Sequence, residues 1–100
     1  MNQQAMMKLR KMQKQMEETQ KELENTVYKG SAGGGMVLVE VKGNHEVLSI
    51  TIDPDALESR DDIEMIQDSI VAALNDANSK LERDAQEKLG AFTGGFGGLF

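Results

Sequence analysis

The spacing of apolar residues changes twice along this chain of 100 residues, and these changes decide what it can fold into. Between residues 5 and 27 the spacing is mostly three or four, between 37 and 52 it is two, and from residue 63 to 89 it is three or four again. Spacings of three and four gather side chains on one face of a helix, whereas a spacing of two gathers them on one face of a strand. The pattern predicts a helix, a group of strands and a second helix.

The first predicted helix ends near Thr26, and its remaining residues are mainly Gln, Lys, Glu and Met, which favour helices. One apolar stripe runs along it, interrupted only at Thr19: Ala5, Leu9, Met12, Met16, Leu23 and Val27. This stripe is typical of an amphipathic helix that buries one face.

The middle of the chain predicts a β-hairpin. Val37, Val39 and Val41 alternate with other residues, and Leu48, Ile50 and Ile52 do the same after the turn residues Gly43 and Asn44. Residues 26–32 are a candidate for a third short strand, so we expect two to three antiparallel strands.

Asp53 and Pro54 have the order of a helix cap followed by proline, and Ser59 with Asp62 resembles a capping box before the second helix. That helix continues to about residue 89. We expect residues 1–90 to form a single domain, and residues 91–100, rich in Gly and Phe, to form a flexible tail.

Helix, strands and helix in this order indicate the α+β class. The stripe of the first helix is longer than so small a sheet can cover, and such a sheet has open edges. A symmetric dimer with joined sheets and paired helices would resolve both problems. A monomer is the alternative.

Several functions are disfavoured by composition. The chain has no cysteine and one histidine, His45, which falls in the predicted hairpin turn, so we expect neither an enzyme nor a metal or cofactor site. The loop at residues 30–35 lacks the pattern of a nucleotide-binding glycine loop, and we expect no small-molecule substrate. Without a long apolar run the sequence predicts a cytoplasmic protein with no membrane partner.

Charge supplies the positive clue. The formal net charge is −6, and residues 30–76 hold ten acidic and two basic side chains, yet residues 1–16 hold four basic side chains and no acidic one. Positive charge at a helix N-terminus opposes the helix dipole, which indicates a polyanionic partner. The candidate phosphate-binding residues are Lys8, Arg10, Lys11, Lys14 and Lys21.

The chain as a whole resembles the YbaB/EbfC family of bacterial nucleoid-associated proteins. The segments that carry the resemblance are Met6-Met7-Lys8, residues 12–16, Ser31 to Val37, Ile52-Asp53-Pro54, residues 68–77, Gly94-Gly95-Phe96 and Leu99-Phe100. The resemblance implies a homodimer with a joined antiparallel sheet and protruding helices, likened to tweezers, that binds DNA and changes its conformation. In many bacteria the family's gene neighbours genes for clamp-loader subunits and a recombination mediator.

The sequence thus predicts a homodimer that binds duplex DNA through phosphates, with little sequence specificity, in the cytoplasm at the nucleoid. The alternative hypothesis is an interaction module for a replication or recombination protein, without direct DNA binding.

Overall fold

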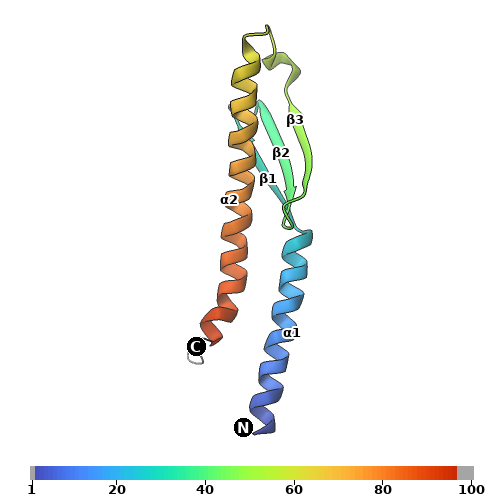
Figure 1. Ribbon diagram of the computed structural model, residues 1–100, viewed down its shortest axis with the longest axis vertical. Helices are drawn as coiled ribbons and strands as arrows, with labels where there is room; N and C mark the ends of the chain where they lie inside the picture. Colours follow the sequence, from blue (N-terminus) through green and yellow to red (C-terminus); the bar gives the residue numbers. More distant parts are fainter. Residues whose placement is uncertain (1, 97–100) are drawn as a thin grey trace.

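The protein is a long, thin α+β domain in which one helix lies along the sheet and the other leaves it at one end (Figure 1). The computed structural model describes residues 2–96, with side chains as far as residue 92. Its elements are α1 (Gln3–Asn25), β1 (Val27–Ala32), β2 (Val37–Lys42), β3 (Val47–Ile52), the 3-10 turn η1 (Pro54–Ala56) and α2 (Asp62–Phe96). The predicted fold class is confirmed, and the third strand forms. The domain extends over 70 × 21 × 15 Å.

The sheet is antiparallel with the strand order β1-β2-β3. β2 is the central strand, and its pairing with β3 places Val37 opposite Ile52 and Val39 opposite Ile50. Alternation along β2 then sends Val37, Val39 and every second residue toward α2, while Leu38 faces away. The register thus puts the valines predicted from the alternation on the buried face.

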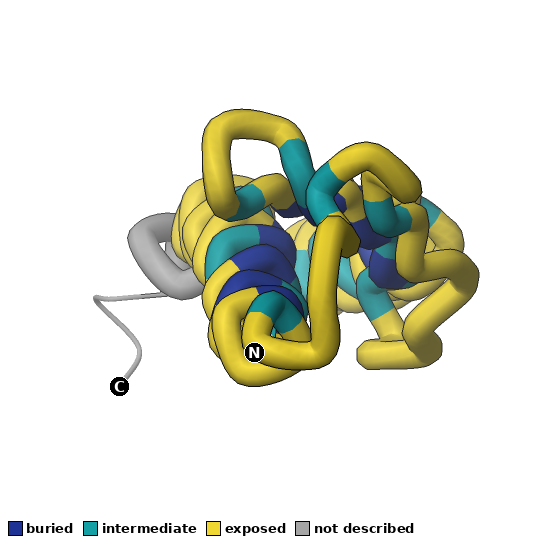
Figure 2. The backbone as a smooth tube through the Cα atoms, turned by 90° about the horizontal axis from the view of Figure 1, so that it is seen from above, coloured by how far each residue is buried: buried dark blue, intermediate teal, exposed yellow. Residues whose placement is uncertain are grey.

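The core lies between α2 and the first two strands. Val37, Val39 and Val41 are at most 1% exposed and pack with Ala73 and Ala77 of α2. Figure 2 shows the buried residues of the helix turned toward those of the sheet. Alanines in the helix keep its axis close to the strands, because close packing in a core leaves no room for voids.

β3 lies beside the contact of α2 with the first two strands and is not covered by α2. Val47, Leu48 and Ile50 are between 43% and 48% exposed, so the apolar alternation predicted the strand correctly but not its environment. A helix about 10 Å wide covers roughly two strands that are about 4.8 Å apart. α2 spans β1 and β2, and the third strand is left uncovered.

α2 is longer than the sequence indicates. It continues through residues 91–96, which the sequence assigns to the flexible tail, and residues 97–100 lie outside the described part. Leu89 and Phe92 are both half-buried at helical spacing on either side of Gly90, and burial of these apolar side chains favours continuation of the helix. No helix in the described part of the chain is long and apolar enough to cross a membrane.

A second contact between β1 and α2 is polar. The Tyr28 hydroxyl donates a hydrogen bond of 2.6 Å to Asp84 Oδ2, and Lys88 Nζ lies 3.2 Å from the same oxygen. Burial, followed by the adjacent Asp84 carboxylate, raises the pKa of Tyr28 to about 12. The hydrogen bond from Tyr28 lowers the pKa of Asp84 below its ordinary value.

The first prediction concerns Gly30 on β1, where a Cβ would overlap the backbone of Ala73 and Ala77. We expect Gly30→Ala to lower the free energy of unfolding by about 2 kcal/mol, because the helix must move away from the sheet. Gly90→Ala is the control, since a Cβ there meets no atom and a helical alanine adds about 0.5–1 kcal/mol. Urea denaturation measures both. Equal effects of the two substitutions would contradict this packing.

The second prediction concerns pH. A tyrosine whose pKa is higher in the folded state stabilises the fold below the ordinary value of 10.0, and this contribution is lost as the pH rises toward about 12. The lowered pKa of Asp84 has the opposite pH dependence. Its contribution to the stability of the fold is present at neutral pH and is lost as the pH falls through the acid range. We expect Tyr28→Phe to cost about 1.5 kcal/mol at pH 7 and to weaken the alkaline loss. Thermal unfolding between pH 7 and 12 is the measurement, and an unchanged alkaline slope would refute the assignment.

Candidate nucleic-acid interface

The cationic residues predicted from the sequence lie on the part of α1 that projects beyond the sheet (Figure 1). Asn2 caps this helix, its side chain accepting a hydrogen bond of 2.8 Å from the Ala5 amide, and no acidic residue occupies the first turn. Four exposed bases, which we call the basic tip, follow within about two helical turns: Lys8, Arg10, Lys11 and Lys14. They form a compact positive surface at one end of the molecule.

The positive charge of the basic tip is not neutralised by the described part of the protein. Among the side chains that the structure describes, none of its four bases forms an ion pair. Their charge is therefore available to an external anion. A phosphate near the first turns of α1 would also offset the unfavourable interaction of these cations with the helix dipole.

Two of the three bases of α2, Lys80 and Lys88, are in a different situation from the basic tip, whereas Arg83 is exposed. Lys80 Nζ lies 3.3 Å from Asp76 Oδ2 and donates a hydrogen bond of 2.9 Å to the Lys29 carbonyl. The Ser31 amide and then Lys80 hold the pKa of Asp76 below its ordinary value. Lys88 is paired with Asp84 in the same way. The i,i+4 spacing of these Asp and Lys residues is the sequence signal that indicates the pairs.

Lys21, the fifth predicted site residue, is set apart from the basic tip. It lies seven residues beyond Lys14, about 10 Å along the helix, in the half nearer the sheet. Four acidic residues share this half of α1: Glu17, Glu18, Glu22 and Glu24. The structure thus brings four of the predicted residues together and leaves Lys21 in an acidic environment.

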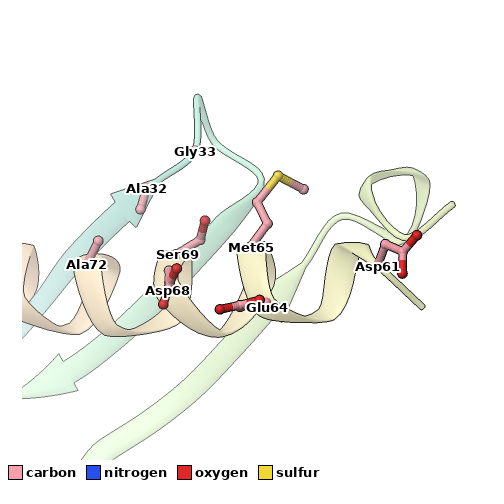
Figure 3. A pocket seen from close by; sticks show the side chains of 8 residues that line it. All are labelled: Ala32, Gly33, Asp61, Glu64, Met65, Asp68, Ser69 and Ala72. Carbon is pink, nitrogen blue, oxygen red and sulfur yellow. The ribbon is translucent and has the colours of Figure 1, made fainter. Parts of the chain in front are cut away.

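An open pocket at the start of α2 has the opposite charge (Figure 3). Asp61, Glu64 and Asp68 line it together with Met65 and Ser69, and its lining includes no basic side chain. It lies toward the end of the molecule away from the basic tip, and it would repel a phosphate (Figure 1). Within the described residues no group of three His, Asp or Glu side chains is arranged to hold a metal ion.

The N-terminus of α1 and the C-terminal end of α2 lie toward the same end of the molecule, and the acidic turn before α2 lies at the other (Figure 1). Charge is consequently separated along the longest axis, which measures 70 Å. That length is several times the Debye length at physiological salt, about 8 Å, so the acidic end does not cancel the potential at the basic tip.

The chain is similar to proteins of one known family. A family model described as the YbaB/EbfC DNA-binding family matches residues 1–96. A nucleoid-associated protein of Chloroflexus aurantiacus is 45% identical over 101 residues, covering 100% of both chains. One of Mycobacterium bovis is 48% identical over 83 residues, which are 83% of this chain and 62% of that protein.

A solved structure has a similar fold. The crystal structure of an uncharacterized protein from Helicobacter pylori matches with a TM-score of 0.66 and 28% identity, over 87% of this chain and 91% of that one. The family is one of DNA-binding proteins and not of enzymes. With the family model matching nearly the whole chain, and full-length relatives at this level of identity, the protein belongs to the YbaB/EbfC family of nucleoid-associated DNA-binding proteins.

Proposed function

We propose that the protein binds duplex DNA as a homodimer through the phosphates, using the basic tip of α1. The observation that carries this proposal is the contrast between the helices: the cations of the tip are exposed and unpaired within the described part of the chain, whereas Lys80 and Lys88 are neutralised by α2's own carboxylates. Lysine and arginine on a convex helix surface reach phosphates more readily than base edges. Low sequence specificity follows from such contacts.

The uncovered third strand supports the homodimer. One edge of β3 pairs with β2, and its other edge has no strand partner within the described residues. Leu48 and Ile50 are exposed on it. Pairing of two β3 strands would satisfy open backbone groups and bury this apolar surface, as an isologous interface requires. The joined sheets would then carry two basic tips.

Two tips on one rigid body would contact DNA at separate points. Binding at both points constrains the path of the duplex, and this is how the protein would alter DNA conformation without reading its sequence. The nucleoid is accordingly the location we propose for it, within the cytoplasm. Lys21 contributes little in this arrangement because neighbouring glutamates repel the phosphates around it.

The third prediction tests the basic tip by charge reversal. We expect Arg10→Glu, Lys11→Glu and Lys14→Glu together to abolish electrophoretic retardation of duplex DNA at low salt, because phosphate attraction becomes repulsion. The matched control reverses Lys29, Lys42 and Arg60, which changes the net charge equally on the sheet and the loop before α2. It should retain binding. Equal loss in both triple variants would show that total charge, not the tip, determines affinity.

Salt and single substitutions refine this test. Eight phosphate contacts, four from each basic tip of the dimer, would give a log-affinity against log-salt slope of about −7, and partial engagement gives about −3 to −6. Lys14→Gln removes one contact from each subunit and should make the slope about two units shallower, whereas Lys21→Gln should leave it nearly unchanged. A larger effect at Lys21 than at Lys14 would contradict the assignment of the tip.

The fourth prediction tests the dimer. We expect Ile50→Lys to give a monomer in sedimentation velocity, since two charged side chains would face each other across the joined sheets. The control is Val71→Lys on α2, where the replaced side chain is 58% exposed. It should sediment like the wild type. A wild-type monomer, or an Ile50→Lys dimer, would reject pairing through β3.

A second candidate is an interaction module for a replication or recombination protein. Met6 and Met7 favour it, because they are 43% and 68% exposed near the N-terminus of α1, and methionine surfaces adapt to different partners. This alternative requires that the wild-type protein fail to retard duplex DNA even at low salt. Retardation that depends on the basic tip would exclude it as the sole function.

A further inference from the structure

The joint between α1 and the sheet consists of one residue. α1 ends at Asn25 and β1 begins at Val27, so only Thr26 separates them. The Thr26 amide donates to the Leu23 carbonyl at 3.2 Å, and its hydroxyl donates to the Glu22 carbonyl at 2.6 Å. These two bonds close the last turn of the helix and leave the joint with little freedom of rotation.

The turn between β2 and β3 lies in close contact with this joint. The Gly43 amide donates a hydrogen bond of 2.9 Å to the Thr26 carbonyl. A Cβ on Gly43 would overlap the Leu23 carbonyl and come within 3.1 Å of Glu24 Cα. The absence of a side chain at this position is required by the close approach of two backbones. Gly34 differs, because its φ of +66° favours glycine while a Cβ there would meet nothing within 4 Å.

Beyond the joint, α1 also contacts α2, but it buries little surface there. Leu23 is the one buried residue of α1 within the described part of the chain. Further along the helix the stripe residues are only half-buried: Leu9, Met12, Met16 and Thr19. The joint is therefore the place where α1 packs most tightly, and the contact with α2 is a looser second constraint on its direction.

A small tilt at the joint has a large effect at the basic tip. Lys14 and Arg10 are 12 and 16 residues from Thr26 along the helix, which corresponds to about 18 and 24 Å. A tilt of about 10° would move them by about 3 to 4 Å at that rise per residue. This is comparable to the separation between a cation and the phosphate that it contacts.

We propose that Gly43 is a positioning residue that sets the direction of α1 and thereby the placement of the basic tip on DNA. The part of this inference that concerns DNA rests on the function proposed above, whereas the part that concerns helix direction does not. Gly43 lies on the hairpin turn, at the opposite end of α1 from the tip, and it meets the end of the helix at Leu23, Glu24 and Thr26.

The experiment measures helix direction and DNA affinity separately. The chain contains no cysteine, so spin labels can be placed at single cysteines replacing the exposed residues Gln13 on α1 and Ser79 on α2. Dilution with unlabelled protein restricts the electron–electron distance measurement to one chain. We expect Gly43→Ala to shift or broaden the distance distribution and to weaken DNA binding several-fold, as judged by retardation at fixed salt.

Two controls separate positioning from stability. Val39→Ala leaves a cavity in the core and lowers the unfolding midpoint, yet it is remote from the joint, so the distances and the affinity of the folded protein should be retained. Gly90→Ala should change neither, because a Cβ there meets no atom. Affinity that follows the unfolding midpoint across all three variants would overturn the proposal.

Insertion of two glycines between Thr26 and Val27 provides a second route if Gly43→Ala does not fold. It lengthens the joint without overlap and should broaden the distances and weaken binding. An unchanged distance distribution or an unchanged affinity would overturn the proposal. If the wild type itself fails to bind DNA, the proposed function is rejected, and the distances alone decide whether Gly43 sets the direction of α1.

Discussion

The close contact of α2 with β1 and β2 is the interaction on which the rest of this molecule depends. It works because small residues meet there: Gly30 on the strand lies under Ala73 and Ala77 of the helix. The valines of β2 complete the apolar layer, and the Tyr28–Asp84 hydrogen bond ties the same two elements together further along. A helix held so close covers two strands fully and cannot cover a third. The exposed apolar surface of β3, and hence the proposed dimer, are consequences of this packing.

The contact of α2 with the sheet also determines where α1 lies. Since α2 already covers the sheet, α1 extends past the sheet, where it contacts α2 and has one buried residue, Leu23, among those described. A projecting helix would be an inefficient way to bury apolar surface, but it carries four cations away from an acidic body. Whether a cation is available to an external anion depends on its position as well as on its charge. Lys80 and Lys88 lie on α2 and are neutralised by neighbouring aspartates. In this fold the exposed cations of the tip are thus distinguished from the two paired lysines of α2.

Much of the fold could be predicted from the sequence, since both periodicities are local properties. The alternation over Val37 to Ile52 indicated two strands, and the cap residues near Asp53 and Asp62 placed the start of α2 closely. The uncovered state of β3 could not be predicted, because its alternation is the same as that of a buried strand. The length of α2 was also missed, because glycines near its end weaken a helix locally and only contacts made by the folded chain offset them. For the candidate site, the net charge of each segment indicated candidate residues near the N-terminus of the chain. It did not indicate which cations would form ion pairs with the protein's own carboxylates.

What the sequence determined by itself is the order of the elements, the excess of bases over acids in the first 16 residues, and the family to which the chain belongs. These depend on neighbours along the chain. The tertiary structure alone decided that four bases form one tip while Lys21 lies among glutamates, and that Lys80 also reaches the Lys29 carbonyl, 51 residues away. It also decided that Gly43, with nothing in its local sequence to distinguish it from other turn glycines, fits against the end of α1. The physical reason is that the close approach of two backbones brings together residues that are distant in sequence. The spacing of residues along the chain does not reveal such contacts.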